Sequence, residues 1–157
     1  MKRSYLSRDK LVEIENNPLY DIDFDEQLSK PPVTLKKGGF LSFMKLLKNE
    51  YGFDMLSNVT SVDYVDHFEV VYDLVNRSEY EELMIKVFLK RETPEIPSLM
   101  PLWPEVDFQE REQYDLMGIK FIGHPDLRRI LMPDNYEGHP LRKDFKANFD
   151  GSGEQSD

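Results

Sequence analysis

The chain has 157 residues, with 20 lysines and arginines against 30 aspartates and glutamates, so its formal net charge is −10. This length allows one compact domain with extensions, and such a domain needs no disulfide or metal for stability. The absence of cysteine excludes a disulfide scaffold, a cysteine-ligated cluster and a thiol nucleophile. The negative charge argues against broad binding of nucleic acid or anionic membranes.

The sequence also argues against membrane insertion. No apolar run reaches the roughly 20 residues of a transmembrane helix. The N-terminal stretch has a basic start but lacks the apolar segment of a signal peptide. We therefore expect a soluble, acidic chain of cytosolic type.

Residues 1–30 show little sustained periodicity. An acidic stretch over 21–26 has no regular spacing, and only Arg8–Ile14 predicts a short helix. We expect this segment to be a loosely held N-terminal arm that ends at Pro31.

Residues 31–122 carry the patterns of an α+β core domain. Apolar residues at three- and four-residue steps predict a helix over 40–51. A second helix is predicted over 104–117, with proline at its first position and Gly118 after its end. Short strands are predicted at 33–35, 59–65, 68–75, 83–89 and 119–122. Sequential hairpins with two main helices indicate a two-layer α+β fold, in which a small mixed or antiparallel sheet is covered by the helices.

The helix predicted over 104–117 carries several charged residues. Asp107, Arg111 and Asp115 recur at four-residue steps, so we expect an ion-pair ladder along one face. Glu110 lies on another face, toward the domain, where a buried carboxylate needs a partner, and we expect an arginine to supply it. Glu110 and Asp115 point about 140° apart around the helix, which disfavours a pair of catalytic carboxylates.

Residues 123–147 are predicted to form an extended strap, because they hold three prolines and two glycines and have no helical period. A short pattern repeats within the strap, since Gly123-His124-Pro125 returns as Gly138-His139-Pro140. Its cations are Arg128, Arg129, Arg142, Lys143 and Lys146. Arginine suits bidentate capture of carboxylates, so we expect the strap to meet an acidic partner surface. Residues 148–157 are poor in apolar side chains and are predicted to be a disordered tail.

Histidines raise a first alternative function. His124 and His139, with Asp126 or Glu137, suggest a metal site and hence an independent metal-dependent hydrolase. Neither the spacing nor a helix makes these ligands converge, so hydrogen bonds from each imidazole to neighbouring backbone are favoured. A second alternative is a free-standing acidic binding module without a redox partner. His67 is predicted to be a turn residue.

Two segments together form a specific pattern. The first reads Glu110-Arg111-Glu112-x-x-Asp115-Leu116-Met117, followed by His124 and by Arg128-x-Ile130-Leu131, and the second reads Glu137-Gly138-His139-Pro140-Leu141-Arg142-Lys143-Asp144-Phe145. This pattern resembles the signature of the 30 kDa subunit family of respiratory complex I, over about residues 38–146. The signature positions, which we predict to form a partner interface, are Glu110, Arg111, Glu112, Asp115, His124, Pro125, Arg128, Arg129, Gly138, His139, Pro140, Arg142, Lys143 and Asp144.

The resemblance implies a cofactor-free structural subunit of the peripheral arm of NADH–quinone oxidoreductase (complex I). Such a subunit is non-catalytic on its own, with NADH, FMN, iron–sulfur clusters and quinone held by partner subunits. It implies contact with the quinone-site subunit, which is homologous to the hydrogenase large subunit, and with neighbouring iron–sulfur subunits. The protein would clamp the quinone-site subunit during electron transfer from NADH to quinone, which is coupled to proton translocation.

The resemblance further implies a peripheral position on the cytoplasmic side of the cell membrane, with membrane contact only through the complex and no nucleic-acid partner. No catalytic, cofactor-binding or metal-ligating residue is predicted in this chain. The short segment after Phe145 leaves an alternative open, because short relatives of this family also occur in membrane-bound hydrogenases and in complexes that receive electrons from ferredoxin. That alternative is the equivalent subunit of a membrane-bound hydrogenase-type or ferredoxin-dependent complex.

Overall fold

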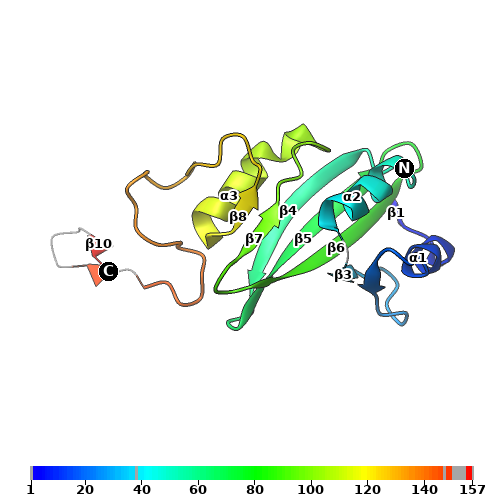
Figure 1. Cartoon of the computed structure of the whole chain (residues 1–157), viewed down its shortest axis with the longest axis horizontal. Coiled ribbons are helices and arrows are strands. Elements are labelled where there is room, and N and C mark those ends of the chain that lie inside the picture. The colour runs from blue at the N-terminus through cyan, green and yellow to red at the C-terminus, as the bar shows by residue number, and fades with distance from the viewer. Residues whose placement is uncertain (1, 38, 147, 150–154, 157) are drawn as a thin grey trace.

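The computed structural model describes residues 2–37, 39–146, 148–149 and 155–156. Figure 1 shows a twisted sheet with α2 lying across it, α3 beside β4, and an extended C-terminal segment next to α3. In the described part of the chain, none of the helices is long and apolar enough to cross a membrane.

The main sheet contains six strands. They are β1 (Ser4–Tyr5), β2 (Asp21–Asp23), β3 (Val33–Lys37), β4 (Met55–Asp63), β5 (His67–Asn76) and β6 (Glu81–Lys90). The strand order is β2-β3-β6-β5-β4, and β1 also pairs with β6. Both β1 and β3 run parallel to β6, whereas the β2–β3, β4–β5 and β5–β6 pairs are antiparallel. The predicted α+β fold with a mixed sheet is therefore confirmed.

The remaining elements lie on and beside this sheet. They are α1 (Arg8–Glu15), α2 (Phe40–Asn49), β7 (Glu95–Pro97), the 3-10 turn η1 (Pro104–Val106), α3 (Asp107–Met117), β8 (Lys120–Ile122), β9 (Asn148–Phe149) and β10 (Gln155–Ser156). Strands β7 and β8 pair in parallel, and β9 pairs with β10. The predicted helix over 104–117 thus begins with a 3-10 turn at its proline. It ends where Gly118 adopts a left-handed φ of 74°, which a glycine reaches without steric strain.

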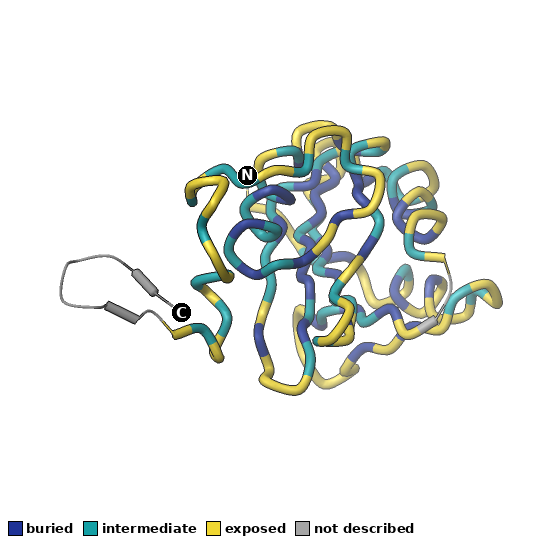
Figure 2. Tube along the Cα trace, turned by 60° about the vertical axis from the view of Figure 1, so that its left-hand side comes forward, coloured by how far each residue is buried: buried dark blue, intermediate teal, exposed yellow. Residues whose placement is uncertain are grey.

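One face of the sheet forms the core with the helices. Alternate residues of β5, among them Phe68 and Tyr72, are fully buried, and the Tyr72 ring contacts Phe40 of α2. Of the β5 residues that point to the opposite face, His67, Glu69 and Asp73 are half-buried, whereas Val71 and Val75 are buried. Figure 2 shows the buried segments at the centre of the molecule and exposed or half-buried backbone at its periphery. The domain is therefore two-layered, and the second face of the sheet is only partly covered.

The N-terminal segment is part of the domain rather than a loosely held arm, so that prediction is wrong. Five of its apolar side chains are buried in the core, namely Leu6, Leu11, Ile14, Ile22 and Phe24. The Tyr5 hydroxyl donates to the Pro31 carbonyl and accepts from the Met84 backbone N–H. Strands β1, β2 and β7 are too short to produce a periodic signal, and long-range pairing alone creates them.

Of the predicted disordered tail, residues 148–149 and 155–156 are the paired strands β9 and β10. The rest of the tail and position 147, the last of the predicted strap, lie outside the described residues.

The burial of α1 yields a test of the N-terminal segment. Leu11 is 2% exposed and its neighbour Val12 is 37% exposed. We expect Leu11→Ala to lower the free energy of unfolding by about 2–5 kcal/mol, because it leaves a cavity in the core. Val12→Ala is the matched control and should change it by less than about 1 kcal/mol. Urea denaturation of both variants measures the difference, and equal small effects would mean that the segment is an arm after all.

Candidate functional site

The signature residues meet where the segment 123–146, called the strap from here on, lies along α3 and the end of the main sheet (Figure 1). The position of α3 is fixed first. The Gln109 side chain accepts the Val59 backbone N–H at 2.6 Å, and Gln113 contacts the Ser61 hydroxyl. These glutamines occupy the free edge of β4, which would otherwise present unpaired backbone groups. The helix is thus held at the sheet edge, with its C-terminal half facing the strap.

The carboxylate of Asp115 is the main attachment point of the strap. One of its oxygens accepts three successive backbone N–H groups, from Ile130 at 3.1 Å, Leu131 at 2.7 Å and Met132 at 2.9 Å. The other oxygen pairs with Arg129 at 2.7 Å, and the side chain is fully buried. Burial alone raises the pKa of Asp115, but these hydrogen bonds and the arginine outweigh it and hold the pKa below its ordinary value.

Arg129 ties the strap to itself as well as to α3. Its guanidinium donates to the backbone carbonyls of Tyr136 and Gly138, each at 2.9 Å, and to the Asp115 carbonyl at 3.1 Å. A planar guanidinium with five donors suits this arrangement of several acceptors. Arg129 therefore closes the loop between the two halves of the strap.

The second half of the strap closes over the end of α3. The His139 ring nitrogen Nδ1 contacts the Asp115 carbonyl at 2.9 Å, and Arg142 Nε donates to the Met117 carbonyl at 2.6 Å. Burial lowers the pKa of His139, which favours the neutral ring. A Cβ on Gly118 would come within 2.6 Å of both side chains, so glycine is required here for space as well as for its φ.

A second carboxylate, Asp63 at the end of β4, holds the C-terminal part of the strap. It accepts two bonds from Arg91 and the Lys143 backbone N–H at 2.8 Å, and Arg91 also pairs with Asp144 at 3.1 Å. The Arg91 hydrogen bond holds the pKa of Asp63 well below its ordinary range. Sequence reasoning missed Asp63 and Arg91. The signal was present, because Asp63 falls on the inward face of β4, where a carboxylate needs a cation.

The predicted ion-pair ladder along α3 is wrong. Asp107 pairs instead with His124, whose Nε2 lies 2.9 Å from its Oδ1, although the two groups are not aligned as a hydrogen bond. Arg111 donates to the Arg128 carbonyl at 3.3 Å and lies over the Phe108 ring. Asp107 and Arg111 therefore find their partners in the strap, and these tertiary contacts replace the ion pairs expected between successive turns of α3. His124 Nδ1 also accepts the Asp126 backbone N–H, which fixes the first turn of the strap.

The prediction that an arginine meets Glu110 is also wrong. Its carboxylate is fully buried and accepts the Ser98 hydroxyl at 2.6 Å and the Leu99 backbone N–H at 2.8 Å. Burial raises the pKa of Glu110, and the two hydrogen bonds oppose that shift. Glu110 thus joins α3 to the loop that follows β7, and no sequence pattern marks Ser98 as its partner.

The signature positions divide into two groups. Those whose side chains or backbone hold the structure together are Glu110, Arg111, Asp115, His124, Arg128 (through its carbonyl), Arg129, Gly138, His139, Arg142, Lys143 and Asp144. Pro125 and the Arg128 side chain are exposed on the strap, while Glu112 and Pro140 are half-buried. Whether any of these positions contacts a partner stays a prediction.

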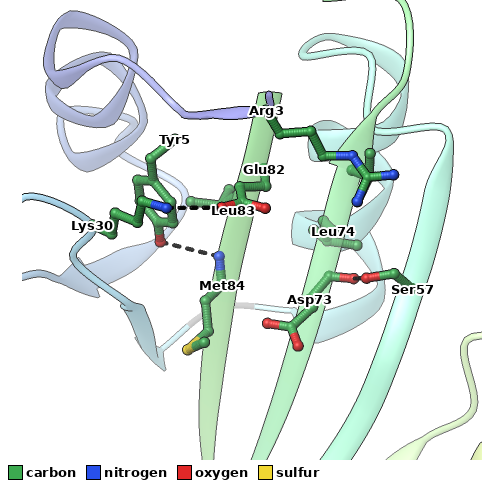
Figure 3. A pocket seen from close by; sticks show the side chains of 10 residues that line it. Arg3, Tyr5, Lys30, Ser57, Asp73, Leu74, Glu82, Leu83 and Met84 are labelled. Carbon is green, nitrogen blue, oxygen red and sulfur yellow. Dashed lines mark hydrogen bonds and ion pairs between the residues drawn. The ribbon is translucent and has the colours of Figure 1, made fainter. Parts of the chain in front are cut away.

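The structure does not gather His124, Asp126 and His139 into a metal site. Within residues 2–37, 39–146, 148–149 and 155–156, no three histidine, aspartate or glutamate side chains form a group that could hold a metal ion. A groove of about 270 Å³ lies at the opposite end of β5 from the strap (Figure 3). Lys30 and Glu82 in its lining pair with each other at 3.4 Å, and Asp73 and Met84 form part of its floor. None of the signature residues lines this groove.

The Asp115 site predicts a specific cost for removing one charge. We expect Asp115→Asn to lower the free energy of unfolding by about 2–4 kcal/mol, because the amide replaces an acceptor of several charge-assisted bonds. Glu112→Gln makes the same chemical change on the half-buried side of α3 and should stay within about 0.5 kcal/mol. Urea denaturation together with proteolysis within the strap measures both effects. Equal stability of the two variants would contradict the anchoring role.

The lowered pKa of Asp115 predicts how acid affects the strap. The unfolded-state pKa of aspartate is about 3.9, so the stabilisation is fully present above that pH and is lost as pH falls through the lower folded-state pKa. The amide protons of Ile130, Leu131 and Met132 should therefore shift together in an NMR titration, with a midpoint below about pH 3.9. A midpoint at or above that value would refute the assignment.

Comparison with known proteins identifies related chains. Residues 33–150 match the family model described as "Respiratory-chain NADH dehydrogenase, 30 Kd subunit". The chain is 45% identical over 133 residues to the C subunit of NADH-quinone oxidoreductase from Moorella thermoacetica, covering 83% of this chain and 90% of that protein. It is 47% identical over 98 residues to the corresponding protein of a Roseiflexus species, where the match spans 60% of this chain and 56% of the relative's length.

Two solved structures are similar as well. The chain matches the trypsin-resistant fragment (1–134) of Nqo5 with a TM-score of 0.65 and 32% identity, covering 76% of this chain and 98% of that one. It also matches a chain of an archaeal membrane-bound sulfane sulfur reductase with a TM-score of 0.73 and 22% identity, over 88% and 84% of the two chains, which shows a shared fold. From the matched family model and the identity to the Moorella protein, the chain belongs to the family of the 30 kDa subunit of the respiratory-chain NADH dehydrogenase.

Proposed function

We propose that this chain is a cofactor-free structural subunit of the peripheral arm of NADH–quinone oxidoreductase, non-catalytic on its own. In this role it clamps the quinone-site subunit, homologous to the hydrogenase large subunit, during electron transfer from NADH to quinone coupled to proton translocation. NADH, FMN, iron–sulfur clusters and quinone are bound by partner subunits. The protein lies peripherally, on the cytoplasmic side of the membrane, beside iron–sulfur subunits.

The observation that carries this proposal is how the charged signature side chains are used. Asp115, Arg129 and Arg142 bind groups within the chain and hold an irregular strap in one conformation. Such a preorganised segment loses little conformational freedom when a partner binds it. A network that fixes a surface segment in one conformation supports a binding role for that segment.

The outer surface of the strap defines the partner chemistry. Leu131 and Leu141 are each 59% exposed, and the Arg128 guanidinium is exposed beside Asp126. Because Arg129 and Arg142 point inward, the strap offers a partner its two leucines together with Arg128, Lys143 and Lys146. Exposed aspartates interrupt these cations, so they do not form a continuous cationic surface. A complementary partner surface would therefore hold apolar pockets for the leucines and an acidic group for Arg128.

The experiment that tests the proposal is affinity purification of the tagged chain from its native membranes, with all co-purifying subunits identified by mass spectrometry. Nucleotide- and flavin-binding subunits beside the quinone-site subunit would support the NADH–quinone assignment. A nickel–iron catalytic subunit without them would move the chain to a hydrogenase-type complex. Purification of the chain alone would refute a role as a subunit.

Two exposed arginines, each paired with an aspartate, provide a matched test by substitution. Arg128 pairs with Asp126 at 3.0 Å, and Arg77, at the β5–β6 turn, pairs with Asp54 at the same distance. We expect Arg128→Ala to reduce the amount of co-purified partner by about tenfold, since a hydrogen bond between charged groups is worth about 1.5–3 kcal/mol. Arg77→Ala should leave recovery unchanged, and both variants should keep the melting temperature within a few degrees. Equal recovery would count against the strap as the interface.

A further inference from the structure

The tip of the β4–β5 hairpin carries a surface that the anchoring network does not use. Three rings stack there in the order Tyr64, His67, Phe88, with centroid distances of 4.9 Å and 4.6 Å and interplanar angles of 15° and 24°. Val62 lies in β4, and Val65 lies in the turn that joins β4 to β5. The tip of this hairpin projects from the sheet (Figure 1). We call these five residues the hairpin patch.

The hairpin patch exposes apolar surface on the partly covered face of the sheet. Tyr64 is 43%, Val65 64% and Phe88 55% exposed, while Val62 and Phe88 flank Glu69 in the strand register. Both outer rings of the stack are therefore partly open to solvent. Exposed apolar side chains gathered at one place, unlike single scattered ones, mark an interaction surface.

The backbone at the tip supports the same interpretation. Val65 has a φ of 75°, in the left-handed region that a β-branched residue rarely adopts. Asp63 holds this conformation by accepting the Val65 backbone N–H at 2.7 Å. Glycine or asparagine would fit the turn with less strain, so the valine brings no local benefit. A strained, exposed apolar side chain is expected where function requires it.

The charges around the rings select the occupant. Asp66 is highly exposed and contacts His67 Nδ1 at 2.7 Å, and Glu69 lies 3.8 Å from the other ring nitrogen. Lys86 and Lys90 flank Phe88 on the same face of β6, and Lys90 is also the cross-strand neighbour of His67. Arg91 is already paired with Asp63 and Asp144. The carboxylates therefore dominate at the Tyr64 end of the stack. An aromatic face beside carboxylates is the environment that favours a guanidinium, which stacks on the ring and pairs with the acid.

We propose that the hairpin patch docks a partner-subunit segment that lays an arginine against Tyr64, within reach of Asp66 and Glu69. The net charge of −10 favours approach of a cationic segment. Asp63 binds both the Val65 and the Lys143 backbone N–H groups, so the patch adjoins the strap. This inference rests on the proposed function, because that function supplies the complex in which the partner is sought.

Photo-crosslinking in the assembled native complex tests this proposal. The photoreactive residue p-benzoylphenylalanine replaces Phe88, with Leu131 of the strap and Tyr80, which is 44% exposed at the other end of β5, as reference positions. We expect position 88 to cross-link to a partner peptide that contains an arginine, and position 80 to give no such product. A product with lipid or nucleic acid only, or none from position 88, would overturn the proposal.

The reference position separates this inference from the proposed function. Products from 131 but not from 88 would overturn the hairpin patch alone. Products from 88 but not from 131 would overturn the strap contact and keep the patch. Absence of products from both positions would overturn both.

Variants give the chemistry of the contact. Tyr64→Leu removes the π face but keeps apolar bulk, and we expect it to speed dissociation from the complex at raised salt by about tenfold. Tyr64→Phe keeps the ring and should behave like the unaltered chain, as should Tyr80→Leu. Unchanged dissociation of Tyr64→Leu, with an unchanged melting temperature, would overturn the cation–π contact.

Discussion

The Asp115 carboxylate is the constraint on which the rest of the functional surface depends. It accepts three consecutive backbone N–H groups of a segment that has no helix or strand of its own, and it neutralises Arg129. An irregular segment must satisfy its backbone groups somewhere, and here one buried side chain does so. Without that acceptor, residues 130–132 would have to turn toward water, and the second half of the strap would lose its attachment to α3.

This arrangement changes how the charged signature is understood. From the sequence, its arginines were expected to form a surface for acidic partners. In the structure, Arg129 and Arg142 instead donate hydrogen bonds to backbone carbonyls of the same chain. What reaches the outside is a mixture, in which Leu131 and Leu141 lie among exposed residues of both charges, such as Arg128, Asp134 and Lys143. Asp63 then joins the strap to the β4–β5 hairpin, because it binds one backbone N–H from each. Two exposed surfaces are thus held in a fixed relation by one carboxylate.

Local patterns predicted much of the fold correctly. The apolar face of α2 and the glycine after α3 mark helices that the structure contains, and the alternation along β5 and β6 marks the paired strands. The prediction for the N-terminal segment was wrong because Leu6, Leu11 and Phe24 are too widely spaced to form a period. Their burial depends on β1 and β3 sharing the same edge of β6, which no local window contains.

For the site, the sequence by itself determined that the charged, proline and glycine positions of α3 and the strap follow a known family pattern, because such a pattern depends only on residue type and order. It also determined that the strap is irregular, because three prolines prevent regular pairing. It did not mark Asp63, Arg91 or Ser98. Only the tertiary structure decided which groups bind each other: Asp107 with His124, Asp115 with Arg129, and Glu110 with Ser98. A carboxylate takes whichever donors folding brings within about 3 Å, and for these three carboxylates the partners are 11 to 17 residues away in the chain.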